Sequence, residues 1–93
     1  MAVISKEVFA MVIFEFAIEN TRVAYDEHQK ALNMLNTYIY LEELYKRRYT
    51  NTFYYYQICV NYYAEKIAEL REIEAEKRRE SIEWQTMCVG LSV

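Results

Sequence analysis

The stretch KRRYTNTFYYY, residues 46–56, decides the fold. Its centre, Thr50-Asn51-Thr52, is the best turn in the chain because it has no strongly apolar residue and supplies side-chain oxygens that can cap a following helix. The segments on either side contain no proline, and the only glycine in the chain is Gly90. Since turns draw heavily on glycine and proline, we expect few turns and therefore few, long elements.

After this turn, apolar residues recur in steps of three and four, the spacing of a helix that buries one stripe. The stripe consists of Phe53, Tyr56, Val60, Tyr63, Ile67 and Leu70. The next positions at this spacing are polar: Glu74, Lys77 and Ser81. Apolar residues return only near the end of the chain, at Trp84 and Cys88. We expect a helix over residues 53–89, which Gly90 ends, and a short tail over residues 91–93.

The polar part of this helix, residues 71–83, carries opposite charges four residues apart. Glu74 can pair with Arg78, and Arg79 with Glu83. We therefore expect a solvated helical segment that is held by helix propensity and charge pairs as much as by packing.

Before the turn, Ser5 is a plausible N-cap for a helix over residues 6–49. One apolar stripe with steps of four and three is expected to pack against the second helix, and it consists of Phe14, Ile18, Thr21, Tyr25, His28, Leu32, Leu35 and Ile39. The polar segment 19–30 is the weak point, because Asp26 and Gln29 can form a capping box that starts a new helix. Two alternatives stay open: one continuous helix, or two helices broken near residues 22–26, which would give three helices in all.

These 93 residues, of which 54% are hydrophobic, form a single domain over residues 1–93. Two helices of about 40 residues would each be about 60 Å long and bury one stripe each. Four apolar residues of the first helix spread over more than one face: Phe9, Val12, Ile13 and Phe16. We predict an all-α protein, a long antiparallel helical hairpin that dimerises into a four-helix bundle or coiled-coil-like assembly. The partner is a second copy or another protein.

Nine of the ten tyrosines lie between residues 38 and 63, on both sides of the turn. Three consecutive rings, Tyr54 to Tyr56, span about 200° of a helix, so at least one is exposed or covered by something else. We expect Tyr54 and Tyr55 to join the first-helix residues in binding a partner protein. A basic cluster, Lys46 to Arg48, adjoins the tyrosines. An alternative to protein binding is that Lys46, Arg47, Arg48 and Tyr49 bind nucleic acid.

Residues that carry chemistry are sparse. The only histidine, His28, has Tyr25 where a bundle metal site would have glutamate, so a polar residue in the helix contact is the simpler interpretation. Neither the hydroxyls nor the two cysteines lie near a base in the sequence, and there is no glycine-rich phosphate loop. We expect no catalytic residue, no cofactor and no metal, and free thiols at Cys59 and Cys88 because one helix carries both.

The apolar run of residues 8–18 is too short to span a bilayer and is interrupted by Glu15, so we expect a soluble, cytoplasmic protein that does not bind membranes. A chain rich in Tyr, Ile, Glu and Arg, with one glycine and no proline, resembles small accessory proteins of phages, plasmids and archaeal viruses. Capsid-associated, host-takeover and anti-defence roles are all compatible with such a source, and only a viral origin would allow a virion-associated protein. The expected function is that of a non-enzymatic structural or protein-binding homodimer. The alternative is a small nucleic-acid-binding dimer.

Overall fold

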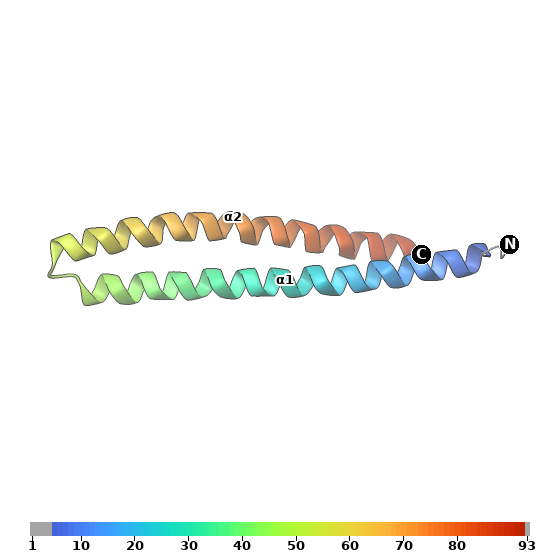
Figure 1. Cartoon of the computed structure of the whole chain (residues 1–93), viewed down its shortest axis with the longest axis horizontal. Coiled ribbons are helices and arrows are strands. Elements are labelled where there is room, and N and C mark those ends of the chain that lie inside the picture. The colour runs from blue at the N-terminus through green and yellow to red at the C-terminus, as the bar shows by residue number, and fades with distance from the viewer. Residues whose placement is uncertain (1–4, 93) are drawn as a thin grey trace.

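The computed structural model describes residues 5–92, which form two long helices joined by a short turn (Figure 1). Helix α1 spans Lys6–Arg48 and helix α2 spans Phe53–Ser92. The helices run antiparallel, side by side, in a body of 74 × 26 × 14 Å, and residues 5–92 contain no strand. The predicted all-α helical hairpin is confirmed.

Helix α1 begins where the sequence indicates and runs without a break. The Ser5 hydroxyl accepts a hydrogen bond from the backbone N–H of Val8 at 3.2 Å, which caps the first turn. Asp26 caps no new helix; its carboxylate binds the guanidinium of Arg22 at 3.2 Å, one turn earlier on the same helix. Of the two alternatives for residues 22–26, the structure has the continuous helix, so the hairpin contains two helices and not three.

The turn lies at the predicted place, but its polar side chains serve a different helix end. The Thr50 hydroxyl donates to the carbonyl oxygens of Lys46 and Arg47, at 2.7 and 3.0 Å. It therefore satisfies the carbonyls left free at the end of α1, where we had expected oxygens that cap the start of α2. The backbone N–H of Thr52 closes the turn by donating to the carbonyl of Tyr49 at 3.0 Å.

The predicted end of the second helix is wrong. Helix α2 continues through Gly90 to Ser92, so residues 90–92 are helical and only Val93 of the predicted tail lies outside the described residues. A glycine stops a helix by adopting a left-handed conformation, and Gly90 has no positive φ. A helical glycine costs only about 1 kcal/mol relative to alanine, which a long helix can absorb.

The predicted stripe of α2 faces α1 except at its first residue, Phe53, which is 80% exposed. Ile67 and Leu70 are buried. The side of α2 that faces α1 stays buried beyond Leu70, where the residues at this spacing are polar, because Ser81 is only 2% exposed. The expectation of a solvated segment over residues 71–83 is therefore wrong on the side that faces α1. Both predicted charge pairs are present: Arg79–Glu83 lies on the outer side at 3.9 Å, and Arg78 reaches from the outer side to the largely buried Glu74 at 3.8 Å.

The predicted stripe of α1 is half right. The structure buries Ala17 and Ala24, at 1% and 6% exposure, where the prediction had their larger neighbours Ile18 and Tyr25, which are 47% and 50% exposed. Both choices fit a three-four spacing, but small side chains let two helix backbones approach closely. The larger apolar residues consequently lie on a second stripe beside the contact with α2.

The hairpin has a thin core and a large surface. Its core consists of Leu35, Ile67 and Leu70, with partly buried Tyr38, Ile39 and Tyr63 packed against it. The accessible surface is 7513 Å², whereas a compact protein of 11.3 kDa exposes about 5,700 Å². The radius of gyration is 21.2 Å, against about 12 Å for a compact domain of this length.

Candidate functional site: two apolar surfaces of α1 and a tyrosine-rich end

The first candidate surface is the N-terminal apolar face, which we define as Phe9, Val12, Ile13 and Phe16. The first turns of α1 extend past the end of α2 (Figure 1), so α2 does not cover them. All four side chains are exposed, from 36% at Ile13 to 64% at Phe16. The Phe16 ring reaches α2, where it meets the Trp84 ring edge-on with centroids 6.3 Å apart. The structure thus places the four predicted residues together on one largely exposed segment.

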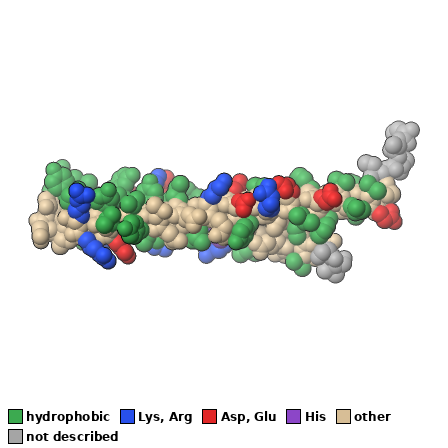
Figure 2. Space-filling model, turned by 90° about the horizontal axis from the view of Figure 1, so that it is seen from below, with side chains coloured by type: hydrophobic (Ala, Val, Ile, Leu, Met, Phe, Trp, Pro, Cys, Tyr) green, Lys and Arg blue, Asp and Glu red, His purple; other side chains and the backbone are tan. Residues whose placement is uncertain are grey.

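The second candidate surface runs along α1 and was not predicted as a binding surface. Its residues recur every seventh position, beside the buried alanines, and we call them the lateral stripe: Met11, Ile18, Tyr25, Leu32 and Ile39. Residues seven apart share one helix face. Met11 is 62% exposed, Ile18 and Tyr25 are about half exposed and Leu32 is partly buried, whereas Ile39 at the end of the stripe packs against the core shared with α2. In Figure 2, seen from the side on which α1 lies, apolar side chains are exposed along the whole molecule.

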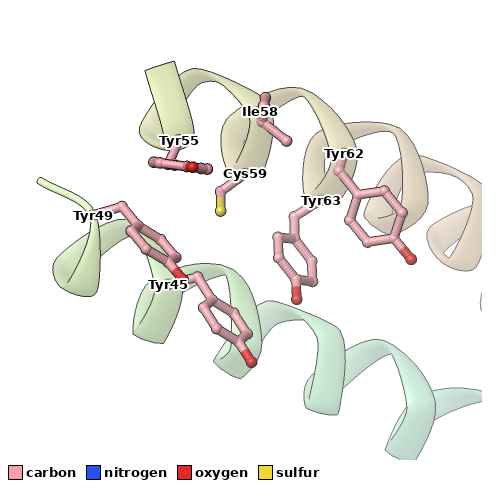
Figure 3. A pocket seen from close by; sticks show the side chains of 7 residues that line it. All are labelled: Tyr45, Tyr49, Tyr55, Ile58, Cys59, Tyr62 and Tyr63. Atoms are coloured by element: carbon pink, nitrogen blue, oxygen red, sulfur yellow. The ribbon is translucent and has the colours of Figure 1, made fainter. Parts of the chain in front are cut away.

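The third candidate surface is the tyrosine-rich end around the turn (Figure 3). The Tyr45 ring is stacked between those of Tyr49 and Tyr63, with centroids 6.2 and 5.9 Å away and interplanar angles of 8° and 12°. Tyr49 also contacts Tyr55 across the turn at 5.7 Å. Rings from α1 and α2 therefore tie the two helix ends together, which accounts for part of the tyrosine clustering as packing.

An open hollow of about 270 Å³ lies between these rings, and its lining is mostly aromatic. It is lined by Tyr45, Tyr49, Tyr55, Ile58, Cys59, Tyr62 and Tyr63. Burial, together with the nearby Tyr45 and Cys59, raises the pKa of the Tyr63 phenol above its ordinary value. Tyr54 and Tyr55, the predicted partner-binding residues, are 70% and 54% exposed at the rim of this end.

The three residues of the predicted basic cluster, Lys46 to Arg48, differ in the contacts that they make. Lys46 pairs with Glu42 on its own helix at 3.4 Å. The Arg48 guanidinium lies 5.8 Å from the Tyr49 ring centroid, a cation–π contact. Among the described residues, Arg47 and Arg48 form no ion pair. All three basic residues occupy the last turn of α1, where they also complement the helix dipole.

Polar side chains join the two helices near the middle of the hairpin. His28 Nε2 lies 3.1 Å from Glu74 Oε1, and both side chains are largely buried, at 16% and 12% exposure. The ammonium of Lys77 binds Glu27 at 3.2 Å, and the hydrogen bond and negative charge of this carboxylate raise the pKa of Lys77. The partner of His28 was missed because it comes from α2, 46 residues along the chain, where no local spacing reveals it.

Nothing in these surfaces assembles reactive groups. Within residues 5–92, no cluster of three His, Cys, Asp or Glu side chains is placed to hold a metal ion. Cys59 and Cys88 are both free, and the Cys88 sulfur lies 3.0 Å from the hydroxyl of Thr21, inside the contact between the helices. The described helices are long, but neither contains a stretch apolar enough to cross a membrane.

Comparison with protein-family models, curated proteins and solved structures finds no match to this chain.

Proposed function

We propose that the chain is a non-enzymatic structural or protein-binding protein that acts as a helical homodimer. Two hairpins pack with their α1 helices inside a four-helix bundle, which covers the lateral stripe, while the N-terminal apolar face lies on the opposite flank of α1 and stays available to another protein. The exposed rings of Tyr54 and Tyr55 then remain at the ends of the bundle, where they form a binding surface for another protein.

The observation that carries this proposal is the width of the apolar surface on α1. A helix that packs against a single neighbour needs one narrow stripe, whereas a helix inside a bundle has apolar residues at three of every seven positions. Helix α1 has this wider pattern: the contact with α2 uses residues such as Ala17 and Ala24, and the adjoining Ile18 and Tyr25 are left half-exposed. The second side of α1 therefore has no neighbour within one chain.

The surface area supports the same proposal. A dimer has twice the mass of one chain, and a compact protein of that size exposes about 9,500 Å², against the 15,026 Å² of two separate hairpins, which is twice 7513 Å². Full compaction would bury about 5,500 Å² in total, and an elongated bundle less. Obligate homodimers bury about 2,000–5,000 Å², so the excess surface is sufficient for a stable dimer.

The test replaces two lateral-stripe residues, Ile18→Asp with Tyr25→Asp, and measures mass by light scattering after gel filtration. Two buried carboxylates would oppose association, so the variant should shift from dimer to monomer. Val23→Asp is the matched control: Val23 is 40% exposed but lies about 200° around α1 from Tyr25, so its mass should not change. Circular dichroism checks that both variants remain helical. A double variant with unchanged mass would exclude the lateral stripe as the interface.

A second candidate function, nucleic-acid binding, is favoured by Arg47 and Arg48, which form no ion pair in the described part of the chain and adjoin stackable rings. Single-stranded nucleic acid is bound by such combinations of cations and aromatic rings. Affinity would then fall steeply as salt rises, because phosphate contacts release counterions. Normal binding by an Arg47→Glu, Arg48→Glu variant would refute this function, and Tyr54→Ser serves as a control for ring loss without charge loss.

A further inference from the structure

Three open hollows lie one after another in the groove between α1 and α2. The first is the tyrosine-lined hollow near the turn (Figure 3), and two others, of about 380 and 480 Å³, share the side chains of Lys30 and Met34. Tyr38 lines the last of them, and its ring lies against that of Tyr63 in the tyrosine-lined hollow, with centroids 6.2 Å apart. The three hollows are therefore continuous along the hairpin.

The helix repeat places these hollows on one side of the hairpin. Eighteen residues make five full turns of an α-helix, so residues eighteen apart share one face. Tyr55 of the tyrosine-lined hollow and Ile73 of the second hollow have this separation on α2, and so do Tyr45 and Glu27 on α1. Both helices therefore present the same face to the groove at each end.

The resulting channel, which we call the side groove, runs along residues 27–49 of α1 and 55–77 of α2, about 33 Å of helix. Met34 and Ile73 are half-exposed on its two walls. Met34 lies nine residues after Tyr25, which is two and a half turns and thus the opposite side of α1. The side groove consequently faces away from the lateral stripe and stays open in the proposed homodimer.

We propose that an amphipathic helix of a partner protein lies in the side groove, as an added helix packed against both α1 and α2. This inference rests on the protein-binding role proposed above and names the form of the partner. Both walls of the groove are helices, whose backbone N–H and C=O groups are already paired within each helix. An extended strand would therefore find no backbone partners there, whereas a helix satisfies its own backbone and needs only an apolar stripe to fill the groove.

The α1 edge of the side groove is basic. Lys30 lines the groove and forms no ion pair within residues 5–92. Arg48, which also forms none there, lies eighteen residues after Lys30 and so on the same face of α1. The only carboxylate in the lining, that of Glu27, is neutralised by Lys77 across the groove at 3.2 Å. A partner helix would therefore meet uncompensated positive charge along α1.

The α2 edge carries carboxylates. Glu69 and Glu76 lie four residues before and three residues after Ile73, and residues at this spacing are neighbours on one helix face. Lys66 offsets Glu69 at 3.7 Å, whereas Glu76 forms no ion pair within residues 5–92. The complementary partner is thus a helix with an apolar stripe, carboxylates along the edge that meets α1 and ammonium groups along the edge that meets α2.

Fluorescence anisotropy of a labelled peptide on the full chain tests the proposal. The probe is a designed helix of about 22 residues, the length of the groove, with leucine at the first and fourth positions of each seven, glutamate along one edge and lysine along the other. It should bind, and a peptide of the same composition with scrambled leucine positions should not. Ile73→Asp, and Met34→Asp on the other wall, should each weaken binding about tenfold or more, because a carboxylate would be buried.

Ile82→Asp is the matched control for Ile73→Asp. It makes the same substitution at an isoleucine that is 55% exposed, nine residues further along and hence on the opposite side of α2. This variant should bind the peptide as the native chain does. Circular dichroism checks that all three aspartate variants remain helical.

The charged edges provide a second measurement. Peptides with lysine on both edges, or glutamate on both, should bind about two- to fivefold more weakly than the mixed peptide, because each exposed ion pair contributes little. In a Lys30→Glu, Arg48→Glu variant the lysine peptide should bind more tightly than the mixed one. Unchanged preference in that variant would contradict the assigned charges.

Light scattering on the same variants separates this inference from the proposed homodimer. Ile73→Asp should keep the mass of the native chain; a shift from dimer to monomer would show that a second copy covers the side groove and would overturn the proposal. Absence of peptide binding, or equal binding by Ile73→Asp and Ile82→Asp, would overturn it and leave the homodimer standing. A monomeric native chain that binds the amphipathic peptide with the expected differences would refute the homodimer and support the side groove.

Discussion

Replacement of Glu74 by alanine should destabilise the hairpin far more than an ordinary surface substitution in α2. The Glu74 carboxylate lies 3.1 Å from His28 Nε2, and the two side chains are 12% and 16% exposed. The substitution leaves the imidazole in the contact between the helices without its partner, whereas the Glu74–Arg78 pair that is also lost is long and solvated, since Arg78 is 56% exposed. The effect should therefore come from His28.

A buried polar group that loses its only partner costs about 1–3 kcal/mol. For a domain of this size, each kcal/mol lowers the midpoint of thermal unfolding by about 4–8 °C. The exposed Glu83, whose pair with Arg79 measures 3.9 Å and is more than two-thirds exposed on both sides, provides a matched control: Glu83→Ala should change stability by about 0.5 kcal/mol or less. The double replacement His28→Leu, Glu74→Leu removes both polar groups and should be close to the native stability or above it.

Circular dichroism at 222 nm during heating measures all four proteins, at one chain concentration because association makes the midpoint concentration-dependent. The expected order places Glu74→Ala clearly lowest, with Glu83→Ala and the double leucine variant near or above the native chain. If Glu74→Ala has the same midpoint of thermal unfolding as Glu83→Ala, or if the double leucine variant is the least stable, then the His28 and Glu74 side chains do not depend on each other as the structure indicates.

Three further predictions concern the core, the end of α2 and a surface charge pair. Leu35→Ala removes a core side chain and should cost about 2–5 kcal/mol by chemical denaturation, while Ile82→Ala, 55% exposed, should cost well under half of that. Gly90→Ala should stabilise the hairpin by about 0.5–1 kcal/mol because a methyl group there meets no atom within 4 Å; a loss of stability would show that Gly90 is not helical. The hydrogen bond and charge of Arg22 hold the pKa of Glu19 below its ordinary value, so the small stabilisation is present above the unfolded pKa and lost as pH falls through the folded one. NMR titration should find this low pKa in the native chain and its return upwards in Arg22→Gln; equal values in both would contradict the pair.

The hairpin itself could be predicted because the signals that determine it are local. Two long segments without proline, separated by Thr50-Asn51-Thr52, permit little else, and the three-four spacing of α2 identified the residues that face α1. The spacing of α1 was ambiguous, since Ala17 and Ile18 fit almost equally well. Hydrophobicity favours the larger residue, while the structure buries the smaller one because it allows the helix backbones to approach.

What could not be predicted depends on contacts between the two helices. His28 was recognised as a polar residue of the helix contact, but its partner Glu74 was assigned to a solvated segment because opposite charges on its own helix explained it equally well. The sequence predicts a helix stop at Gly90, but composition does not show whether a glycine adopts a left-handed conformation, and this one does not. The sequence places Ile18 and Tyr25 in the stripe that packs against α2, and only the structure shows that these two residues lie beside that contact.

The most direct test of the unfinished core is the mass of the native chain in solution, measured by light scattering over a range of concentrations together with its helical content. Half-exposed residues along α1 predict a helical dimer of twice 11.3 kDa that dissociates and loses stability on dilution. A stable, fully helical monomer of 11.3 kDa at every concentration would contradict the account.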